Sequence, residues 1–410
     1  MDKLFIYGIL GFSFIALAAV LACAQESEKT LEMSDNSKYI TLFMAGDVMT
    51  GRGIDQILPH PSNPAIYEPY VKDARDYVAL AEKVNGPIHS PVKFSYIWGD
   101  ALEVLDRKNP DIRLINLETS ITTNNEFWPG KGIQYRMHPA NIGCLTAAKL
   151  DYCSLANNHV LDWHYAGLFD SLETLKKARI QYSGAGRNQN DAIMPAVFDV
   201  PDKGRVIIFS WGLEDSGIPR SWAASHDTPG VNLLPDLSPK TIRHINAQVS
   251  AVKKPLDIVV ASIHWGSNWG YNIPAEHSEF AHRLIDDAKV DVVYGHSSHH
   301  FRPLEVYKGK LIIYGAGDFL NDYEGIRGYE SFRSELALMY FANVDPANGR
   351  LSQLQMVPTV TKRFKVNLAT GEDARWLQEK LNKTSKIFGS RVDLLEDNTL
   401  TLKIGNTAQQ

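Results

Sequence analysis

Three histidines follow one short apolar run in the second half of this 410-residue chain. The run VDVVYG spans residues 290–295, and His296, His299 and His300 come directly after it. Imidazole nitrogens carry protons near neutral pH and are the commonest protein ligands of metals. The spacing therefore predicts metal or acid–base chemistry at the end of a buried strand, carried by His296 and His299. We interpret His300 as structural or surface-exposed.

Further polar side chains stand at the ends of other apolar runs. They are Asp47, Glu118, Asn157, Asn158, His159 and His264. Taken alone, an aspartate or asparagine in such a place is more often a turn or cap residue. In an open α/β sheet, however, ligands bind in the crevice beyond the carboxyl ends of the strands. We therefore expect these residues to converge with the histidines in one pocket, each following a strand of the same sheet.

The elements that must position these residues alternate along the chain. Strand-like runs rich in β-branched and large apolar residues span 39–46, 111–118, 151–157, 257–266 and 291–296. Apolar residues at three- and four-residue intervals predict helices at 99–108, 166–178, 239–254 and 275–288. This alternation predicts an α/β fold with helices on both faces of a sheet. Turn residues between extended runs predict two hairpins, at 196–212 and 304–317.

The composition is that of a globular protein, with 44% hydrophobic and 22% charged residues. The formal net charge of -5 gives no basic surplus, so nucleic acid is not an expected partner. We interpret Cys144 and Cys153 as buried thiols on a helix and a strand, with a single structural disulfide as the alternative.

Residues 1–24 have the pattern of a secretory leader, with an early lysine, a long apolar run and small residues at the end. The sequence VLAC, which ends at Cys23, is similar to a bacterial lipobox, and we favour a lipidated cysteine. Cleavage after Ala24 and an uncleaved anchor helix are the alternatives. All three place the mature chain outside the cytoplasm, membrane-anchored or else secreted or periplasmic. The polar residues 25–38 predict a tether.

Six segments in order resemble the bacterial capsule synthesis family CapA, the poly-gamma-glutamate biosynthesis proteins, which are related to calcineurin-like metallophosphoesterases. The segments are GDVMTGR (46–52), NLETSIT (116–122), SLANNHVLDW (154–163), HWG (264–266), GHSSH (295–299) and GAGDF (315–319). The resemblance implies an α/β, metallophosphoesterase-like layered sandwich of mixed β-sheets flanked by helices over residues 39–345. Residues 346–410 would form a C-terminal extension that packs on the same domain.

The resemblance also implies two metal sites. The first would use Asp47, Glu118 and His299, and the second Asn158, His264, His296 and a share of Glu118. This mixture of ligand atoms suits Mn, Fe or Zn. Met49 stands where metallophosphoesterases carry a histidine. We therefore expect one tightly held transition metal and a second, weaker ion. Asp318 stands where the family commonly has asparagine.

The remaining implied roles concern catalysis and substrate. His159 would donate a proton to a leaving group. We interpret Asp162 as a supporting residue near the site or a cap. Arg52 and Arg136 would hold an anionic group, because a guanidinium offers paired donors to phosphate or carboxylate. Arg52 would also take part in catalysis. Trp265 would form the wall of the substrate pocket.

The expected function is that of an exported metal-dependent hydrolase-like protein. It would take part in synthesis, release or export of an anionic surface polymer such as poly-gamma-glutamate, acting on the polymer or on a phosphoester-like substrate. The alternative is a non-catalytic lipoprotein that binds an anionic polymer for a surface-assembly system. The expected partners are capsule-assembly proteins and the membrane, through the N-terminal lipid or anchor.

Overall fold

The computed structural model describes residues 38–404. The predicted leader at 1–24, and the predicted tether at 25–38 except for its last residue, lie outside the described residues. Within the described part of the chain, no helix combines the length and apolar character needed to span a membrane.

The larger of the two main sheets has ten strands. Eight follow the order β19-β20-β17-β16-β1-β2-β5-β6, while β15 pairs with β1 and β18 with β17. The bounds are β1 Ile40–Val48, β2 Ile112–Leu117, β5 Tyr152–Ser154, β6 Gln181–Ser183, β15 Asp318–Leu320, β16 Leu336–Val344, β17 Leu351–Thr361, β18 Val366–Leu368, β19 Arg391–Leu394 and β20 Leu400–Lys403. Strands β1, β2, β5 and β6 run parallel, so their carboxyl ends meet at one edge.

The second main sheet has six strands in the order β13-β14-β12-β11-β9-β8. The bounds are β8 Ala196–Val200, β9 Gly204–Gly212, β11 Asp257–His264, β12 Val292–His296, β13 Leu304–Tyr307 and β14 Lys310–Ile313. The four central strands are parallel. The pairs β8–β9 and β13–β14 are antiparallel, which confirms both predicted hairpins. Two small pairs, β3 (Ser120–Ile121) with β4 (Arg136–Met137) and β7 (Ala185–Gly186) with β10 (Gly230–Val231), complete the strands of the described residues.

The two main sheets pack face to face around a shared apolar core. Alternate residues of a strand point to opposite faces, so Leu42 and Met44 of β1 point into the core between the sheets. Val260 of β11 belongs to the same core, and the Tyr294 hydroxyl of β12 donates to the Ala45 carbonyl of β1. The fold is therefore the expected layered sandwich of mixed sheets.

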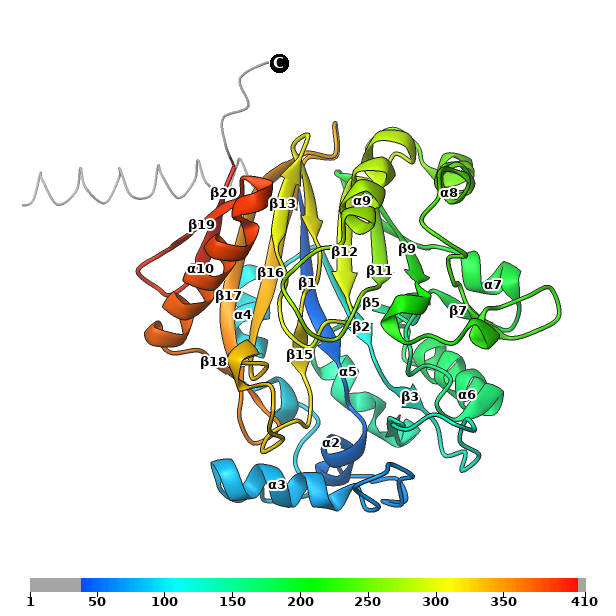
Figure 1. Cartoon of the computed structure of the whole chain (residues 1–410), viewed down its shortest axis with the longest axis vertical. Helices are drawn as coiled ribbons and strands as arrows, with labels where there is room; N and C mark the ends of the chain where they lie inside the picture. The colour runs from blue at the N-terminus through cyan, green and yellow to red at the C-terminus, as the bar shows by residue number, and fades with distance from the viewer. Residues whose placement is uncertain (1–37, 405–410) are drawn as a thin grey trace, which may run out of the picture.

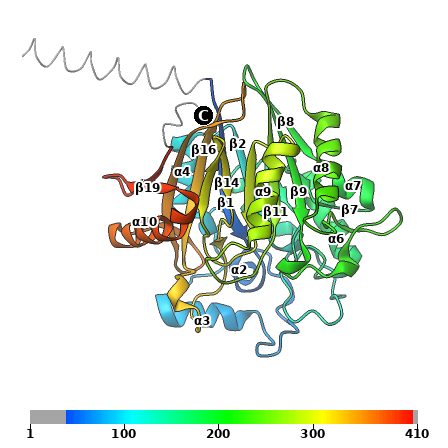
Figure 2. The ribbon, with the colours of Figure 1, turned by 45° about the horizontal axis from the view of Figure 1, so that its top comes forward.

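Helices cover the outer faces of the sandwich (Figures 1 and 2). The helices are α2 Arg52–Ile57, α3 Arg75–Asn85, α4 Ala101–Lys108, α5 Gly143–Ala147, α6 His164–Lys177, α7 Gln189–Ile193, α8 Pro239–Val252, α9 Ala275–Asp287 and α10 Gly371–Ser385. Helices α4 and α6 pack on the larger sheet, and α8 and α9 on the smaller one. The expectation of helices on both faces of one sheet is thus wrong, because the inner face of each sheet is covered by the other sheet.

The C-terminal residues join both sheets. Helix α10 contacts β19 and β17 of the larger sheet and β13 of the smaller one. Its Leu377 and Leu381 are buried in the core between the sheets. Thr370 caps the helix in a reciprocal pair with Asp373.

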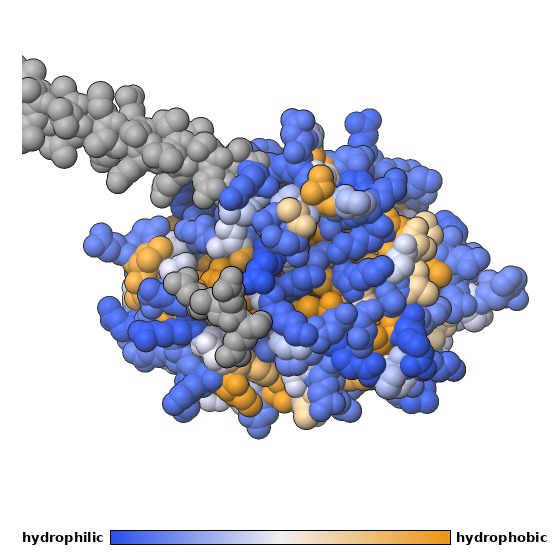
Figure 3. Space-filling view, turned by 90° about the horizontal axis from the view of Figure 1, so that it is seen from above, coloured by the Kyte–Doolittle hydropathy of each residue, from blue (hydrophilic) through white to orange (hydrophobic). Residues whose placement is uncertain are grey.

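The two ends of the sandwich differ. The chain passes from β1 into α2 at the lower end of Figure 1, where the carboxyl ends of the parallel strands lie. Seen from the opposite end, the surface is mainly hydrophilic, and apolar side chains gather in separate small patches (Figure 3). Cys144 and Cys153 are both free and buried, which confirms the interpretation as buried thiols rather than a disulfide.

Candidate metal centre

Strands from both sheets deliver polar side chains to one place. Asp47 lies near the end of β1, and Glu118 follows β2 directly. His264 and His296 are the last residues of β11 and β12 and are paired in register. The expectation that all these strands belong to one sheet is therefore wrong. The residues meet because the two sheets pack face to face with their parallel strands ending on the same side.

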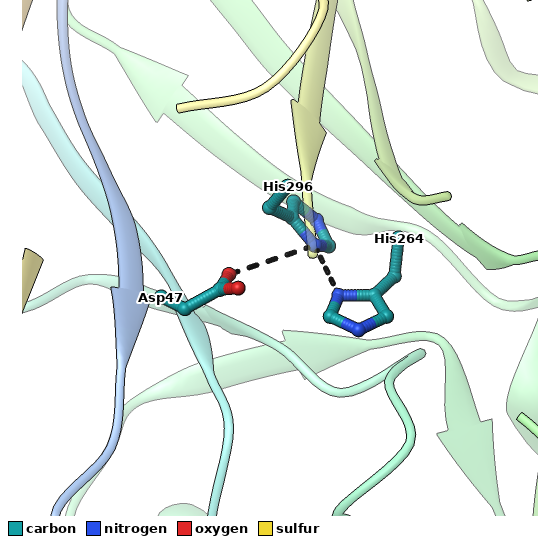
Figure 4. A group of neighbouring side chains, drawn as sticks. All are labelled: Asp47, His264 and His296. Atoms are coloured by element: carbon teal, nitrogen blue, oxygen red, sulfur yellow. Dashed lines mark hydrogen bonds and ion pairs between the residues drawn. The ribbon is translucent and has the colours of Figure 1, made fainter. Parts of the chain in front are cut away.

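One group of possible ligands contains an aspartate and two histidines (Figure 4). Ligand atoms of Asp47, His264 and His296 lie within 4.8 Å of one another, and all three residues are buried. The Nδ1 atoms of the two histidines are 2.8 Å apart, and Nδ1 of His296 is 4.0 Å from Oδ1 of Asp47. On the other side of His264, Nε2 lies 3.2 Å from Oδ1 of Asn158. The structure thus brings together the predicted ligands Asn158, His264 and His296.

The two imidazoles are held neutral, the form that binds metals. Burial lowers the pKa of His264 well below its ordinary value, and the neighbouring His296 lowers it further. Burial also lowers the pKa of His296 to about 3. Nε2 of His296 lies 2.8 Å from the Ser262 hydroxyl, which leaves Nδ1 directed at His264 and Asp47. Two neutral imidazoles whose Nδ1 atoms face each other cannot both donate there, so at least one of these atoms is an acceptor.

A second group consists of three buried carboxylates. Ligand atoms of Asp47, Glu118 and Asp318 lie within 4.8 Å of one another. Burial and then the charge of Asp318 raise the pKa of Asp47 to about 8. Burial, followed by the charge of Asp47, raises the pKa of Glu118 well above its ordinary value. Three carboxylates this close repel one another when ionised, and a divalent cation between them would remove that cost.

Asp318 was not among the predicted ligands. It reaches the centre because β15 pairs in parallel with β1, which places Asp318 directly beside Asp47. The signal for it was the segment GAGDF, in which an aspartate replaces the asparagine that the resembling family commonly has. Asp318 gives the first site one carboxylate more than expected.

His299 lies at the same centre but pairs differently from the expectation. Its Nδ1 is 3.0 Å and 3.1 Å from the two carboxylate oxygens of Asp318. Burial alone would lower the pKa of His299, but the charge and hydrogen bond of Asp318 outweigh burial and raise it. His299 therefore acts together with Asp318 in this structure and belongs to neither group of close ligand atoms.

His159 lies beside these groups and points one nitrogen at them. Its Nδ1 is 2.6 Å from Oδ2 of Asp162, and its Nε2 is 3.8 Å from Oε1 of Glu118. The ring stacks on Tyr135 with the centroids 3.8 Å apart. Burial lowers the pKa of His159 to about 4, against the charge of Asp162. Asp162 thus orients the ring, as expected for a group behind a proton carrier.

Lys131 joins this pair, and no sequence pattern had marked it. Its Nζ lies 2.8 Å from Oδ1 of Asp162 and 3.1 Å from Nδ1 of His159. The ammonium group therefore neutralises the carboxylate that orients His159.

The two arginines expected to hold an anionic group are already engaged. Arg52 is buried, with Nη2 and Nε on Asp322 and Nη1 2.9 Å from Oε1 of Glu68. Arg136 donates to the main-chain carbonyl of Asn124 at 2.7 Å and to that of Asn63 at 2.9 Å. In this structure both guanidinium groups bind protein groups, and their part in holding an anionic group stays a prediction.

Trp265 does not form the wall of the pocket. It is 1% exposed, its Nε1 donates to the Tyr314 carbonyl at 3.0 Å, and its ring stacks on His277. Trp265 follows the last residue of β11 and packs in the apolar core of the second sheet. Trp269, four residues on, takes the expected place and stacks on Tyr329 with the centroids 4.0 Å apart.

A cavity of about 480 Å³ opens at the centre, and both members of this stack belong to its wall. His299 links the cavity to the candidate metal ligands, and Tyr135 and Tyr323 add aromatic wall. Tyr135 and Tyr323 share a hydrogen bond of 2.6 Å between their hydroxyls. We call this cavity the central cavity.

The donor set as a whole fits a divalent transition metal. Imidazole nitrogens, an amide oxygen and carboxylates converge, and these residues are almost fully buried except for the half-buried Asn158. Such a mixture is typical of Mn, Fe or Zn, whereas Mg and Ca are bound by oxygen alone.

A comparison with protein families finds a match over a large part of the chain. The model of the bacterial capsule synthesis protein family PGA_cap matches residues 41–323. The chain is 49% identical over 369 residues to a probable polyglutamine synthesis accessory protein of Mycobacterium tuberculosis, covering 90% of this chain and 97% of that one. It is 27% identical to the PGA biosynthesis protein CapA of Bacillus subtilis, over 80% of this chain and 73% of that one.

Among solved structures, one described as a novel phosphatase of Mycoplasma pneumoniae aligns with 80% of this chain and 96% of its own. The TM-score is 0.44 and the identity 13%. At these values the likeness carries no functional argument.

Proposed function

Because this chain belongs to the bacterial capsule synthesis protein family PGA_cap, we propose that it takes part in the synthesis, release or export of an anionic cell-surface polymer as a metal-dependent hydrolase. An accessory part in capsule or polyglutamate synthesis follows from the family and from the names of its relatives. The hydrolytic step is our addition. The observation that carries it is the convergence of ligand atoms from Asp47, His264 and His296 within 4.8 Å.

The candidate ligands divide into a nitrogen-rich and an oxygen-rich half. Asn158, His264 and His296 would hold one ion, and Glu118 and Asp318 another, with Asp47 between them. When bound, the ions supply Lewis acidity at the bond to be hydrolysed. We expect the nitrogen-rich half to hold its Mn, Fe or Zn tightly and the other half to hold an ion more weakly.

The chain's own part in the reaction is proton transfer and orientation. His159 faces the centre with Nε2, while Asp162 and Lys131 fix the other side of the ring. Because the pKa of the ring is lowered to about 4, Nε2 is unprotonated at neutral pH. We assign to His159 the uptake of a proton from the attacking water at Nε2 and its delivery to the leaving group. The stacked Trp269 and Tyr329 would orient a chain segment of the substrate along the cavity wall.

We further propose that the protein works outside the cytoplasm, held at the membrane through Cys23. The apolar leader and the sequence VLAC support this placement. At the membrane it would meet the capsule-assembly proteins. Replacing Cys23 with serine should move the protein from the membrane fraction to the soluble fraction, and unchanged membrane association would favour an uncleaved helix instead.

A second candidate function is polymer binding without turnover. Met49 stands where metallophosphoesterases carry a histidine, and in this structure its sulfur accepts a hydrogen bond from the Gly51 amide at 3.2 Å. The loss of that ligand favours a centre that is structural rather than catalytic.

One experiment separates the two functions. Purified protein is reconstituted with manganese, iron and zinc in turn, its metal content is measured, and cleavage of a generic phosphodiester and of poly-gamma-glutamate is followed. Turnover that requires the metal supports the hydrolase. Tight metal without turnover on either substrate, together with polymer binding that survives chelation, supports the binding protein.

A further inference from the structure

A second cavity, of about 400 Å³, is lined by basic side chains and by no carboxylate. We call it the basic cavity; its lining residues are Pro87, His89, Val92, Lys93, Ser95, Tyr96, Arg363 and Lys365. Lys93 and Arg363 are exposed, and Lys365 is half-buried. A recess whose walls carry charge of one sign concentrates the field and attracts ions of the opposite sign.

The cations of the basic cavity form no ion pair with a carboxylate in the described part of the chain. In the described part of the chain, no carboxylate lies within ion-pair distance of Lys93, Arg363 or Lys365. The ammonium of Lys365 lies 5.9 Å from the ring centroid of Tyr96, whose hydroxyl donates to the Arg363 carbonyl at 2.9 Å. Tyr96 therefore lies between cations that have no carboxylate partner among the described residues.

The loop that carries two of these cations is fixed in place. Arg363 and Phe364 adopt left-handed backbone conformations, with φ of 57° and 51°. Their main-chain amides donate to the two oxygens of the Glu324 carboxylate at 2.8 Å and 2.6 Å. The Phe364 side chain is fully buried. A loop pinned at its backbone in this way holds the Arg363 side chain at the surface.

The same loop separates the basic cavity from the central cavity. Lys362 and Glu324 line the central cavity, whereas Arg363 and Lys365 line the basic one. Lys362 and Arg363 are adjacent in sequence, with Cα atoms about 3.8 Å apart. A ligand held in the basic cavity would therefore lie next to the mouth of the candidate metal centre.

The central cavity is itself a poor place to hold a polyanion. Its wall includes Glu324, Glu330 and Glu335. Of its two cations, Arg52 is paired internally with Asp322 and Glu68, which leaves Lys362. The positive charge that a chain of carboxylates needs is therefore found beside the centre and not inside it.

We propose that the basic cavity formed by Lys93, Arg363 and Lys365 is a binding site for the carboxylate groups of an anionic polymer, outside the candidate metal centre. This inference rests on the proposed function in polymer metabolism and adds the place where the polymer is held. The guanidinium of Arg363 offers paired donors to a carboxylate, and the two ammonium groups bind further carboxylates of the same chain. The polymer then crosses the loop past Lys362 to the central cavity.

The test uses the full-length chain, purified in detergent, and a fluorescent oligomer of gamma-linked glutamate. Binding is measured by fluorescence anisotropy for the parent, for the double variant Lys93→Glu/Lys365→Glu and for Arg363→Glu. We expect both variants to bind at least about tenfold more weakly than the parent, and the parent's affinity to fall with added salt.

A matched control exists at another basic groove. Lys176 and Arg179 line a cavity of about 540 Å³ beside strand β6. Asp191 lines the same cavity. The double variant Lys176→Glu/Arg179→Glu makes the same change of charge at a different place. It should bind the oligomer within about twofold of the parent, because general surface charge acts weakly at a distance in salt. Equal loss in this control would overturn the proposal.

Metal content and thermal unfolding are measured on the same samples. Variants that keep the parent's metal content and unfolding temperature but lose the oligomer support the proposal. Variants that bind like the parent overturn it and leave the proposed hydrolase untouched. If the parent holds metal but binds no oligomer, both the proposed role of the basic cavity and the polymer part of the proposed function are overturned. If the parent holds no metal but binds the oligomer in a way that depends on Arg363, only the proposed hydrolase activity is overturned.

Discussion

His264 and His296 end neighbouring strands of the second sheet, paired in register, with their Nδ1 atoms 2.8 Å apart. The register of these parallel strands places the two side chains next to each other. Asp47 reaches the same point from the other sheet, at 4.0 Å from His296. The candidate centre thus lies where the two sheets meet. A substitution of one ligand should reduce metal binding more than it reduces folding stability.

Removal of His296 should cost most of the bound metal. His296→Ala deletes a direct ligand, and the loss of affinity should exceed the roughly 10- to 100-fold typical of groups that only support ligands. Metal analysis after equilibration with a competing chelator measures the loss. The exposed His226 provides a control, since His226→Ala should hold as much metal as the parent. Metal content at the parent's level in His296→Ala would rule out this histidine as a ligand.

Asp318→Asn should weaken the oxygen-rich half of the centre selectively. Asparagine keeps the size of the side chain but removes the charge that faces Asp47 and binds His299. In a titration with manganese, the weaker binding event should shift to higher concentration while the tight event remains. His299→Ala should cause a smaller loss than His296→Ala, because His299 lies in neither group of close ligand atoms. A simultaneous loss of both binding events would contradict this division.

His159→Ala should retain metal and lose turnover. Its Nδ1 lies 2.6 Å from Asp162, and His159 belongs to neither group of close ligand atoms, so we expect it to carry a proton rather than to coordinate. General acid–base catalysis contributes about 10²- to 10⁴-fold to a rate, so hydrolysis of a phosphodiester should fall by that amount at unchanged metal content. Asp162→Asn removes the charge that orients the ring and pairs with Lys131, and its activity should fall between those of the parent and the alanine variant. If His159→Ala loses metal, the residue is a ligand and not a proton carrier.

Metal binding should become stronger as the pH rises toward about 8. Burial and the charge of Asp318 raise the pKa of Asp47 to about 8. Below that pH the carboxyl group of the free protein holds a proton, which a metal must displace; above it the carboxylate is already ionised. Calorimetry in buffers of different ionisation enthalpy should therefore detect proton release at pH 6 to 7 and less release above pH 8. A release that does not change over this range would show that Asp47 is ionised throughout.

Replacement of Arg52 should reduce stability more than metal binding. Arg52→Met leaves the buried carboxylates Asp322 and Glu68 without their partner. Breaking a buried ion pair on one side typically costs about 3–5 kcal/mol of unfolding free energy. Chemical denaturation measures this cost, and Arg333→Met, at a partly exposed pair with Asp373, provides the milder control. Full stability with loss of turnover would restore the catalytic role first assigned to Arg52.

The amino-acid sequence by itself determined the strands and the residues that end them. Asp47, Glu118, His264 and His296 stand after apolar runs, and such runs form strands for local reasons, namely side-chain volume, branching and turn residues. Parallel strands end at one edge, so the pattern predicted that Asp47 lies near Glu118 and His264 near His296. The meeting of these two pairs depends on how the two sheets pack. His159 was marked in the same way, whereas its pairing with Asp162 appears only in the structure.

Only the tertiary structure decided which polar groups pair with one another. Asp318 lies beside Asp47 through the register of β15 on β1, across 271 residues of chain. Arg52 finds Asp322 at a sequence separation of 270 residues, and this pairing removes it from the substrate side. Trp265 and Trp269 look equivalent in the sequence, yet the first packs in the core and the second lines the cavity. Burial and charge pairing depend on contacts between distant segments, and local patterns carry no record of which segments will meet.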